Sequence, residues 1–227
     1  MADSKISALT ALTGANVDTA ADFFAIVDTD VATTKKILPD EVANALKATQ
    51  AEVNAMTSAN TLLTPAINKI VLGTEQASTS GTSIDFTGIP AGVRRITVML
   101  AGVSTNGTSP LLLQLGDAGG VEATGYSGNC IAAIDGAVGA AGYTTGFGLD
   151  QVGAATHVRH GSIILTLENS TAFTWTAMGI LSNSDAVRGN WTSGSKSTSA
   201  ELDRVRITTV NGSDTFDAGA INISYER

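Results

Sequence analysis

The sequence predicts a mainly β protein whose C-terminal part is an antiparallel, jelly-roll-like β-sandwich. Apolar and polar residues alternate over short segments, as in residues 82–86, where Ile84 and Phe86 fall on one face of a strand. Turn residues separate these segments, among them Asn106 and Gly107. The composition, with 24 Gly and only 4 Pro in 227 residues, suits many turns and small side chains.

About ten strands are expected, a number that suits two packed sheets. The alternating segments are residues 82–86, 94–103, 111–115, 129–134, 143–150, 161–167, 173–181, 188–191, 202–210 and 216–225. The glycine-rich segments 119–120 and 139–142 and the serine-rich run 192–200 are expected to be surface loops.

A helix is expected ahead of the sandwich, over residues 39–58. It begins at Pro39, which suits a first helical turn, and continues with two carboxylates at the positive end of the helix dipole. A heptad-like stripe follows, made up of Val42, Ala45, Thr49, Val53 and Met56. A helix with so weak a stripe either lies on another surface or bundles with copies of itself. We predict the second, a trimeric neck over residues 39–66, between a small module (1–38) and the sandwich (67–227).

The charge balance excludes several classes of function. The formal net charge is −8, and no basic run is longer than two residues, so nucleic acid is not an expected partner. The N-terminus shows neither a signal peptide nor an apolar span, so membrane insertion is not expected and synthesis as a soluble cytoplasmic product is. The single cysteine, Cys130, excludes an intrachain disulfide and is expected to be a buried apolar residue.

No catalytic or cofactor site is expected. His157 and His160 could offer two metal ligands, but residues at i and i+3 of a strand point to opposite faces and no other ligand lies nearby. A contact between subunits, where one His per chain could collect an ion on an oligomer axis, is the alternative. Asp28, Thr29 and Asp30 lack the full ligand set of a calcium loop and are interpreted as a turn. No nucleophile elbow or phosphate-binding glycine motif is present.

Two stretches of the sandwich resemble one protein family. Residues 80–116, SGTSIDFTGIPAGVRRITVMLAGVSTNGTSPLLLQLG, are similar to the first strands of a β-rich C-terminal domain of tailed-phage tail fibres and related virion proteins, and residues 216–226, FDAGAINISYE, to its closing strand. Residues 6–46 resemble the N-terminal modules that hold such fibres to the virion. The resemblance implies an intertwined homotrimer, and virion attachment through residues 1–38, whose apolar residues are Ile6, Leu9, Leu12, Phe23, Phe24 and Ile26.

The function that this resemblance implies is that of a short tail fibre or receptor-binding protein, located in the virion. Its N-terminal module would bind other tail, baseplate or capsid proteins, and its sandwich would bind a host surface glycan or protein without catalysis. A capsid or baseplate decoration protein, or head fibre, without a receptor is the alternative. A polysaccharide-degrading tail protein is the third possibility.

Two aromatic residues are the receptor-binding candidates. Trp191 and Tyr126 each lie among Gly, Ser, Thr and Asn residues, at the expected ends of strands. Aromatic rings in such surroundings suit the stacking of a sugar or the anchoring of a protein contact. The alternative for each is a ring folded over the edge of a sheet.

Overall fold

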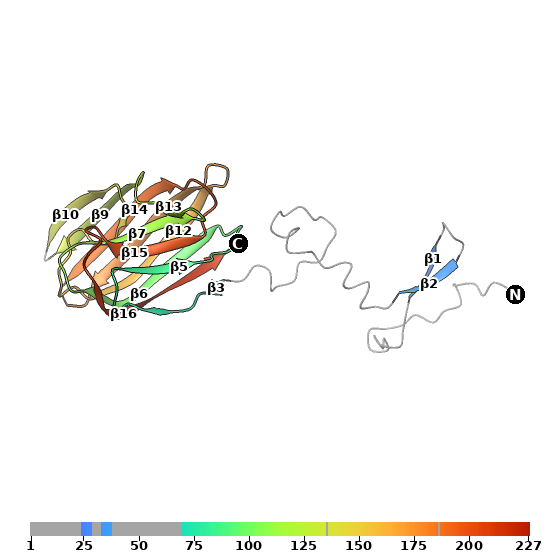
Figure 1. Cartoon of the computed structure of the whole chain (residues 1–227), viewed down its shortest axis with the longest axis horizontal. Coiled ribbons are helices and arrows are strands. Elements are labelled where there is room, and N and C mark those ends of the chain that lie inside the picture. Colours follow the sequence, from blue (N-terminus) through green and yellow to red (C-terminus); the bar gives the residue numbers. More distant parts are fainter. Residues whose placement is uncertain (1–23, 29–32, 38–69, 135, 186) are drawn as a thin grey trace. The chain divides into compact units, whose positions relative to one another are not determined.

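The computed structural model describes residues 24–28, 33–37, 70–134, 136–185 and 187–227 (Figure 1). The chain divides into two units, Met1–Ile67 and Asn68–Arg227. Within the described residues all regular structure is β, and the paired strands run antiparallel. The prediction of a mainly β protein is therefore confirmed.

The first unit contains one described hairpin. Strand β1 (Phe24–Asp28) pairs with β2 (Thr33–Ile37), with Phe24 opposite Ile37 and Asp28 opposite Thr33. Phe24 and Ile26 of the predicted attachment module lie in β1. The other residues predicted for attachment and for the neck lie outside the described residues: Ile6, Leu9, Leu12, Phe23, Val42, Ala45, Thr49, Val53 and Met56.

The larger sheet of the second unit has nine strands among the described residues. Its order is β10 (Ala137–Tyr143), β9 (Ser127–Ile134), β14 (Arg188–Ser197), β13 (Thr174–Asn183), β12 (Arg159–Asn169), β6 (Arg95–Thr105), β16 (Phe216–Glu226) and β3 (Val71–Leu72), with β4 (Gln76–Ala77) also pairing with β16. Strands β12, β13 and β14 form a meander, so three segments that follow one another in the chain lie side by side.

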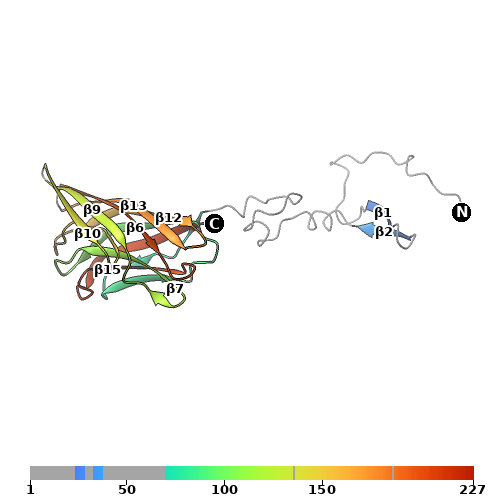
Figure 2. The same cartoon turned by 90° about the horizontal axis from the view of Figure 1, so that it is seen from above.

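The smaller sheet has five described strands and faces the larger one (Figures 1 and 2). Its order is β11 (Phe147–Gly148), β7 (Leu111–Asp117), β15 (Arg204–Thr209) and β5 (Ser83–Thr87), with β8 (Gly120–Val121) pairing with β7. The two sheets make the second unit a β-sandwich, as the alternating segments predict.

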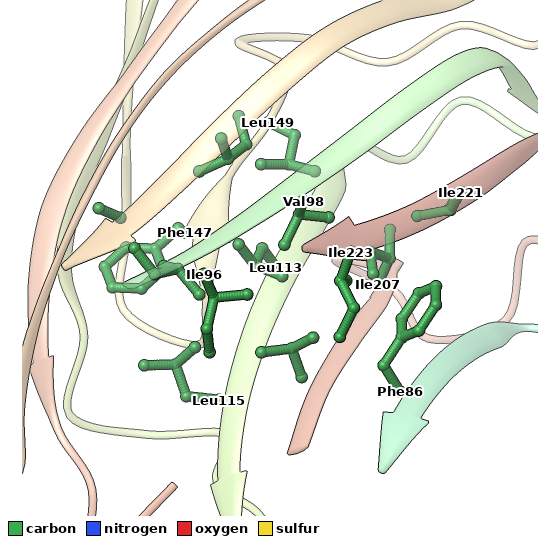
Figure 3. Close-up of a cluster of buried hydrophobic side chains, with 14 of the residues drawn as sticks. Phe86, Ile96, Val98, Leu113, Leu115, Phe147, Leu149, Ile207, Ile221 and Ile223 are labelled. Carbon is green, nitrogen blue, oxygen red and sulfur yellow. The ribbon is translucent and has the colours of Figure 1, made fainter. Parts of the chain in front are cut away.

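The core lies between the two sheets. Alternate residues of β6, β12 and β16 pack against alternate residues of β5, β7 and β15, because successive side chains of a strand point to opposite faces. Ile96, Val98 and Leu113 are fully buried examples, and Figure 3 shows them among their neighbours. Each such aliphatic side chain stabilises the fold by about 1.5–3 kcal/mol.

Two segments predicted as loops are strands instead, and Gly120 of a third, residues 119–120, begins β8. Residues 139–142 belong to β10, with Gly139 opposite Ala132 and Gly142 opposite Asn129 of β9. Residues 192–197 of the serine-rich run belong to β14, which pairs with both β13 and β9. In both segments pairing with neighbouring strands outweighs a local sequence that lacks apolar alternation.

The predicted strand over residues 143–150 is wrong in its length. Tyr143 is the last residue of β10, and after it only Phe147 and Gly148 of this segment form a strand, β11. The hydroxyl of Tyr143 donates a 2.5 Å hydrogen bond to the carbonyl of Asp150, which joins the two ends of this turn.

Two glycines allow β6 and β16 to approach closely where their register shifts. Gly219 has φ 93° and Gly102 has φ 69°. A Cβ placed on Gly219 would lie 2.4 Å from the carbonyl carbon of Gly102. A side chain at residue 219 is therefore excluded by both backbone conformation and space.

We expect Gly219→Ala to lower the free energy of unfolding in urea by roughly 3 kcal/mol. Gly212→Ala is the matched control, because Gly212 also has positive φ (66°) but its Cβ would meet no atom within 4 Å. The control should lose only about 1–2 kcal/mol, the cost of the left-handed conformation. Equal losses in the two variants would show that the close approach of β6 and β16 does not matter.

Candidate functional site

The outer face of the nine-stranded sheet has no charge along its middle. Side chains on this face form cross-strand rows that run from β10 to β16. One row is Ala140, Ile131, Trp191, Ile180, Ser162, Met99 and Asn222. The next is Gly142, Asn129, Ser193, Met178, Ile164, Thr97 and Ser224. We call these two rows the uncharged rows.

The uncharged rows expose large apolar side chains. Met178 is 65% exposed, Ile180 57%, and Trp191 and Ile131 44% each. Ile180, Trp191 and Ile131 are direct cross-strand neighbours, so their side chains form one continuous surface. Contiguous exposed apolar surface of this kind marks binding sites, whereas isolated exposed apolar residues do not.

The outer face of the five-stranded sheet is different, because it is charged. Arg206 of β15 makes a two-point ion pair with Asp85 of β5, with both nitrogen–oxygen distances 2.6 Å. Next to it, Arg204 pairs with Asp203 at 2.7 Å. The two outer faces of the sandwich are thus chemically distinct, and the uncharged one is the candidate for contacts that exclude water.

Trp191 lies beside a hollow in this face. The indole extends over Gly189, so that a Cβ on Gly189 would lie 3.2 Å from the indole Cη2. Gly189 also lines a hollow of about 440 Å³, together with Ala133, Gly136, Ser182, Asn183, Val187 and Arg188. The hollow lies at the end of the sheet where β9 turns into β10 and β13 turns into β14. A flat aromatic ring beside such a hollow can bind a ring-shaped group by stacking.

The predicted position of Trp191 needs one correction. The sequence places it at the end of a strand that stops at residue 191, whereas β14 continues to Ser197 and holds the ring on its outer face. Its backbone is therefore fixed on both sides, by Ile180 of β13 and Ile131 of β9. A rigidly held ring loses little conformational entropy when it binds.

Tyr126 does not belong to this surface, and its prediction as an exposed ring is wrong. The residue is 3% exposed, and its ring packs edge-on against Phe147, with centroids 5.1 Å apart. Its hydroxyl accepts a hydrogen bond from the Leu115 amide at 2.7 Å and donates one to the Glu122 carbonyl at 2.8 Å. Burial raises the pKa of this phenol. Tyr126 is a structural residue that joins β7 to the segment before β9.

The two histidines contact different groups. His160 Nδ1 accepts a hydrogen bond from the Gly102 amide at 3.1 Å, and its Nε2 lies 3.2 Å from Ser184 Oγ. His157 is buried, with Nε2 3.3 Å from an Arg188 nitrogen. Within the described part of the chain, no group of three or more His, Cys, Asp or Glu residues could hold a metal ion.

A buried polar cluster near His157 was not predicted. Arg159 and Asp150 are both fully buried, and Arg159 Nε donates to Asp150 Oδ2 at 2.6 Å. Arg159 also donates to the His157 carbonyl at 3.2 Å. Asp150 and Arg159 are nine positions apart in the sequence, and no sequence motif marks them as partners. A buried pair of this kind fixes one arrangement of the chain more than it adds net stability.

Cys130 is fully buried, as predicted. It packs with Leu112 and Tyr143 in a small cluster separate from the main core. Burial, and next the charge of Asp150, raise the pKa of its thiol to about 12. The thiol is therefore neutral near pH 7 and is not a nucleophile.

A second groove, of about 380 Å³, lies where the two sheets separate beside the edge strand β5. Gln76 donates a 2.7 Å hydrogen bond from its side chain to the carbonyl of Asp85. This bond occupies a backbone acceptor on β5, which protects an edge strand from pairing with another chain. We therefore interpret this groove as part of the fold.

Comparison with protein-family models, with curated proteins and with solved structures finds no match to this chain. Among the residues described, no helix is long and apolar enough to cross a membrane.

We expect Tyr126→Phe to lower the free energy of unfolding by about 1–3 kcal/mol, because it leaves the buried Leu115 amide without its acceptor. Tyr225→Phe is the matched control, since the Tyr225 hydroxyl makes no hydrogen bond within the described residues. Urea unfolding monitored by circular dichroism measures both variants. If the two lose the same small amount, the Tyr126 hydroxyl does not hold β7 in place.

Acidification should destabilise the fold through His157. Burial, and next the nearby charge of Arg188, lower the pKa of this imidazole, with Arg159 acting in the same direction and Asp150 and Asp185 opposing it. Below about pH 6.5 the unfolded chain therefore takes up a proton that the folded chain does not, and stability falls until pH drops below the folded pKa.

His157→Gln removes this titration and should flatten the dependence of unfolding free energy on pH between pH 7 and the folded pKa. A slope that His157→Gln leaves unchanged would contradict the assignment.

Proposed function

We propose that this chain is a structural protein of a tailed-bacteriophage virion, a short tail fibre or receptor-binding protein. The similarity of residues 80–116 and 216–226 to fibre domains supports this role, as does the β-sandwich that these residues help to form. The observation on which the proposal rests most is the exposed indole of Trp191 beside a hollow of about 440 Å³ on an uncharged face.

The sandwich would contact the host surface through this site, by binding without catalysis. Trp191 offers a flat face for a sugar ring or an apolar side chain, and Ser182 lines the hollow with a hydroxyl for hydrogen bonds. Arg188 is the one charged residue among the described residues that line the hollow, and the chain as a whole is acidic, with net charge −8, so a neutral glycan or a neutral protein surface suits this face better than a polyanion.

Weak binding at each site would become strong through repetition. In this proposal residues 1–38 attach the fibre to tail, baseplate or capsid proteins, residues 39–66 form the neck, and three chains assemble. Three identical sites on one fibre, and several fibres on one particle, raise the effective concentration of each further contact. Avidity can then exceed single-site affinity by about 10²–10⁴-fold without any new type of contact.

We expect Trp191→Ala to weaken binding to host cells, or to immobilised bacterial surface polysaccharide, by about thirtyfold per site, the effect of losing a central aromatic contact of about 2 kcal/mol. Val210→Ala is the matched control, because Val210 is 46% exposed but lies in the turn between β15 and β16 and is not among the residues that line the hollow. It should bind like the unaltered protein. Surface plasmon resonance at low loading measures single-site affinity and limits the contribution of avidity.

Unchanged binding by a folded Trp191→Ala variant would contradict the proposed site. Binding of the unaltered protein to phage particles but not to any host surface would contradict receptor binding and indicate a decoration role instead. Release of reducing sugar from the polysaccharide would contradict binding without catalysis.

A further inference from the structure

Four buried side-chain nitrogens gather at one end of the inner face of the larger sheet. They are Nδ1 of His157, Nη2 of Arg159, Nδ2 of Asn183 and Nε of Arg188, and none of them has a hydrogen-bond partner within the described part of the chain. We call these four residues the donor cluster. Buried polar atoms without partners cost free energy and are rare in native proteins, so four in one place indicate a common cause.

Strand pairing places three members of the donor cluster side by side. Asn183 of β13 lies directly opposite Arg159 of β12 on one side and directly opposite Arg188 of β14 on the other. Side chains in such positions share one face of the sheet and have Cβ atoms about 4.5–5.5 Å apart. Leu181, two residues before Asn183, is fully buried in the main core, so the shared face is the inner one.

The fourth member, His157, contacts both arginines. Its carbonyl accepts a hydrogen bond from Arg159 Nη1 at 3.2 Å, and its Nε2 lies 3.3 Å from Arg188 Nη1. Because a guanidinium can only donate, Nε2 is the acceptor, and the proton of the neutral imidazole is on Nδ1. Burial, and next the charge of Arg188, lower the pKa of His157, which favours this neutral form. All four unpaired nitrogens of the donor cluster are therefore donors.

The charges around the donor cluster do not cancel. Arg159 and Arg188 bring two positive charges, whereas one carboxylate of the described residues pairs with them, that of Asp150 with Arg159 at 2.6 Å. Asp185 lies nearby, where it accepts from the Val158 amide, but it is exposed and water screens its charge. The four unpaired donors stand against one unpaired acceptor, Asp150 Oδ1. Water donates as many hydrogen bonds as it accepts, so an anion, which only accepts, fits this ratio better.

We infer that the donor cluster binds a small monovalent inorganic anion such as chloride. The ion accepts hydrogen bonds from Arg159 Nη2, Asn183 Nδ2 and Arg188 Nε, and its charge balances the second guanidinium. Asn183 and Arg188 also line the hollow of about 440 Å³, which gives the ion a path of entry. The position is interior, so it suits a single ion and not a charged polymer. The inference does not depend on the proposed virion role.

Thermal unfolding of the full-length protein at constant ionic strength tests this inference. Sodium gluconate, whose anion is too large for the interior of the fold, is replaced stepwise by sodium chloride. An ion that binds only the folded chain stabilises it by mass action, so each tenfold rise in chloride above its dissociation constant should raise Tm by about 3–5 °C. The same Tm at every chloride concentration would overturn the inference.

Asn183→Asp should abolish the chloride dependence, because it places a fixed negative charge between Arg159 and Arg188. The carboxylate can still accept the hydrogen bond that Asn190 Nδ2 donates to residue 183. Asn169→Asp is the matched control, since it changes the net charge equally and the exposed Asn169 side chain accepts from two backbone amides, as a carboxylate also can. The control should keep the chloride dependence, and a dependence that Asn183→Asp also keeps would contradict the site.

A crystal of the unaltered protein grown in bromide gives a second test that needs no variant. Bromide scatters anomalously, and we expect an anomalous peak within hydrogen-bond distance of Arg159 Nη2 and Arg188 Nε. Water alone at this position would overturn the inference. A bromide peak without any effect of chloride on Tm would mark an adventitious ion only and would overturn it as well.

Discussion

The structure depends on burying the inner face of a sheet that is wider than the sheet packed against it. Nine described strands face five, so the aliphatic side chains of β5, β7 and β15 cannot cover the whole of it. Towards β9 and β10 the cover comes from Leu112 and Tyr143, and at the end of β12 it comes from the buried pair of Arg159 and Asp150. Because the inner face is used for burial, contacts with other molecules must use the outer faces and the turns.

The strands that could be predicted from the sequence are those whose inward residues are aliphatic. Ile96, Val98 and Leu100 alternate in a way that only a strand explains, and β6 contains them. Strand β10 and the second half of β14 have Gly, Ala, Ser and Thr where such residues would be expected, and inward positions such as Thr192 and Lys196 are polar. These segments are strands because a neighbour pairs with them, which a local pattern cannot reveal.

The candidate site could be predicted only in part, for the same reason. Trp191 and Tyr126 have nearly the same local composition, yet one ring is 44% exposed and the other 3%. What separates them is a set of distant contacts: the Leu115 amide and the Phe147 ring hold Tyr126, whereas Gly189 leaves the space over which Trp191 extends. The ion pair of Arg159 with Asp150 likewise depends on how the segment before β12 folds back. The lack of charge along the uncharged rows appears only once the strand register is known, because its members come from seven strands.

The proposed site for the host surface is centred on Trp191, whose cross-strand neighbours on the outer face are Ile180 and Ile131. Hydroxyl-radical footprinting of the full-length protein, read at Trp191, tests this site most directly, because a bound surface shields the side chains that it covers. We predict that Trp191, which is 44% exposed, is oxidised in the protein alone and is protected when host cells are added. Oxidation of Trp191 that host cells do not change would contradict the use of this face for binding.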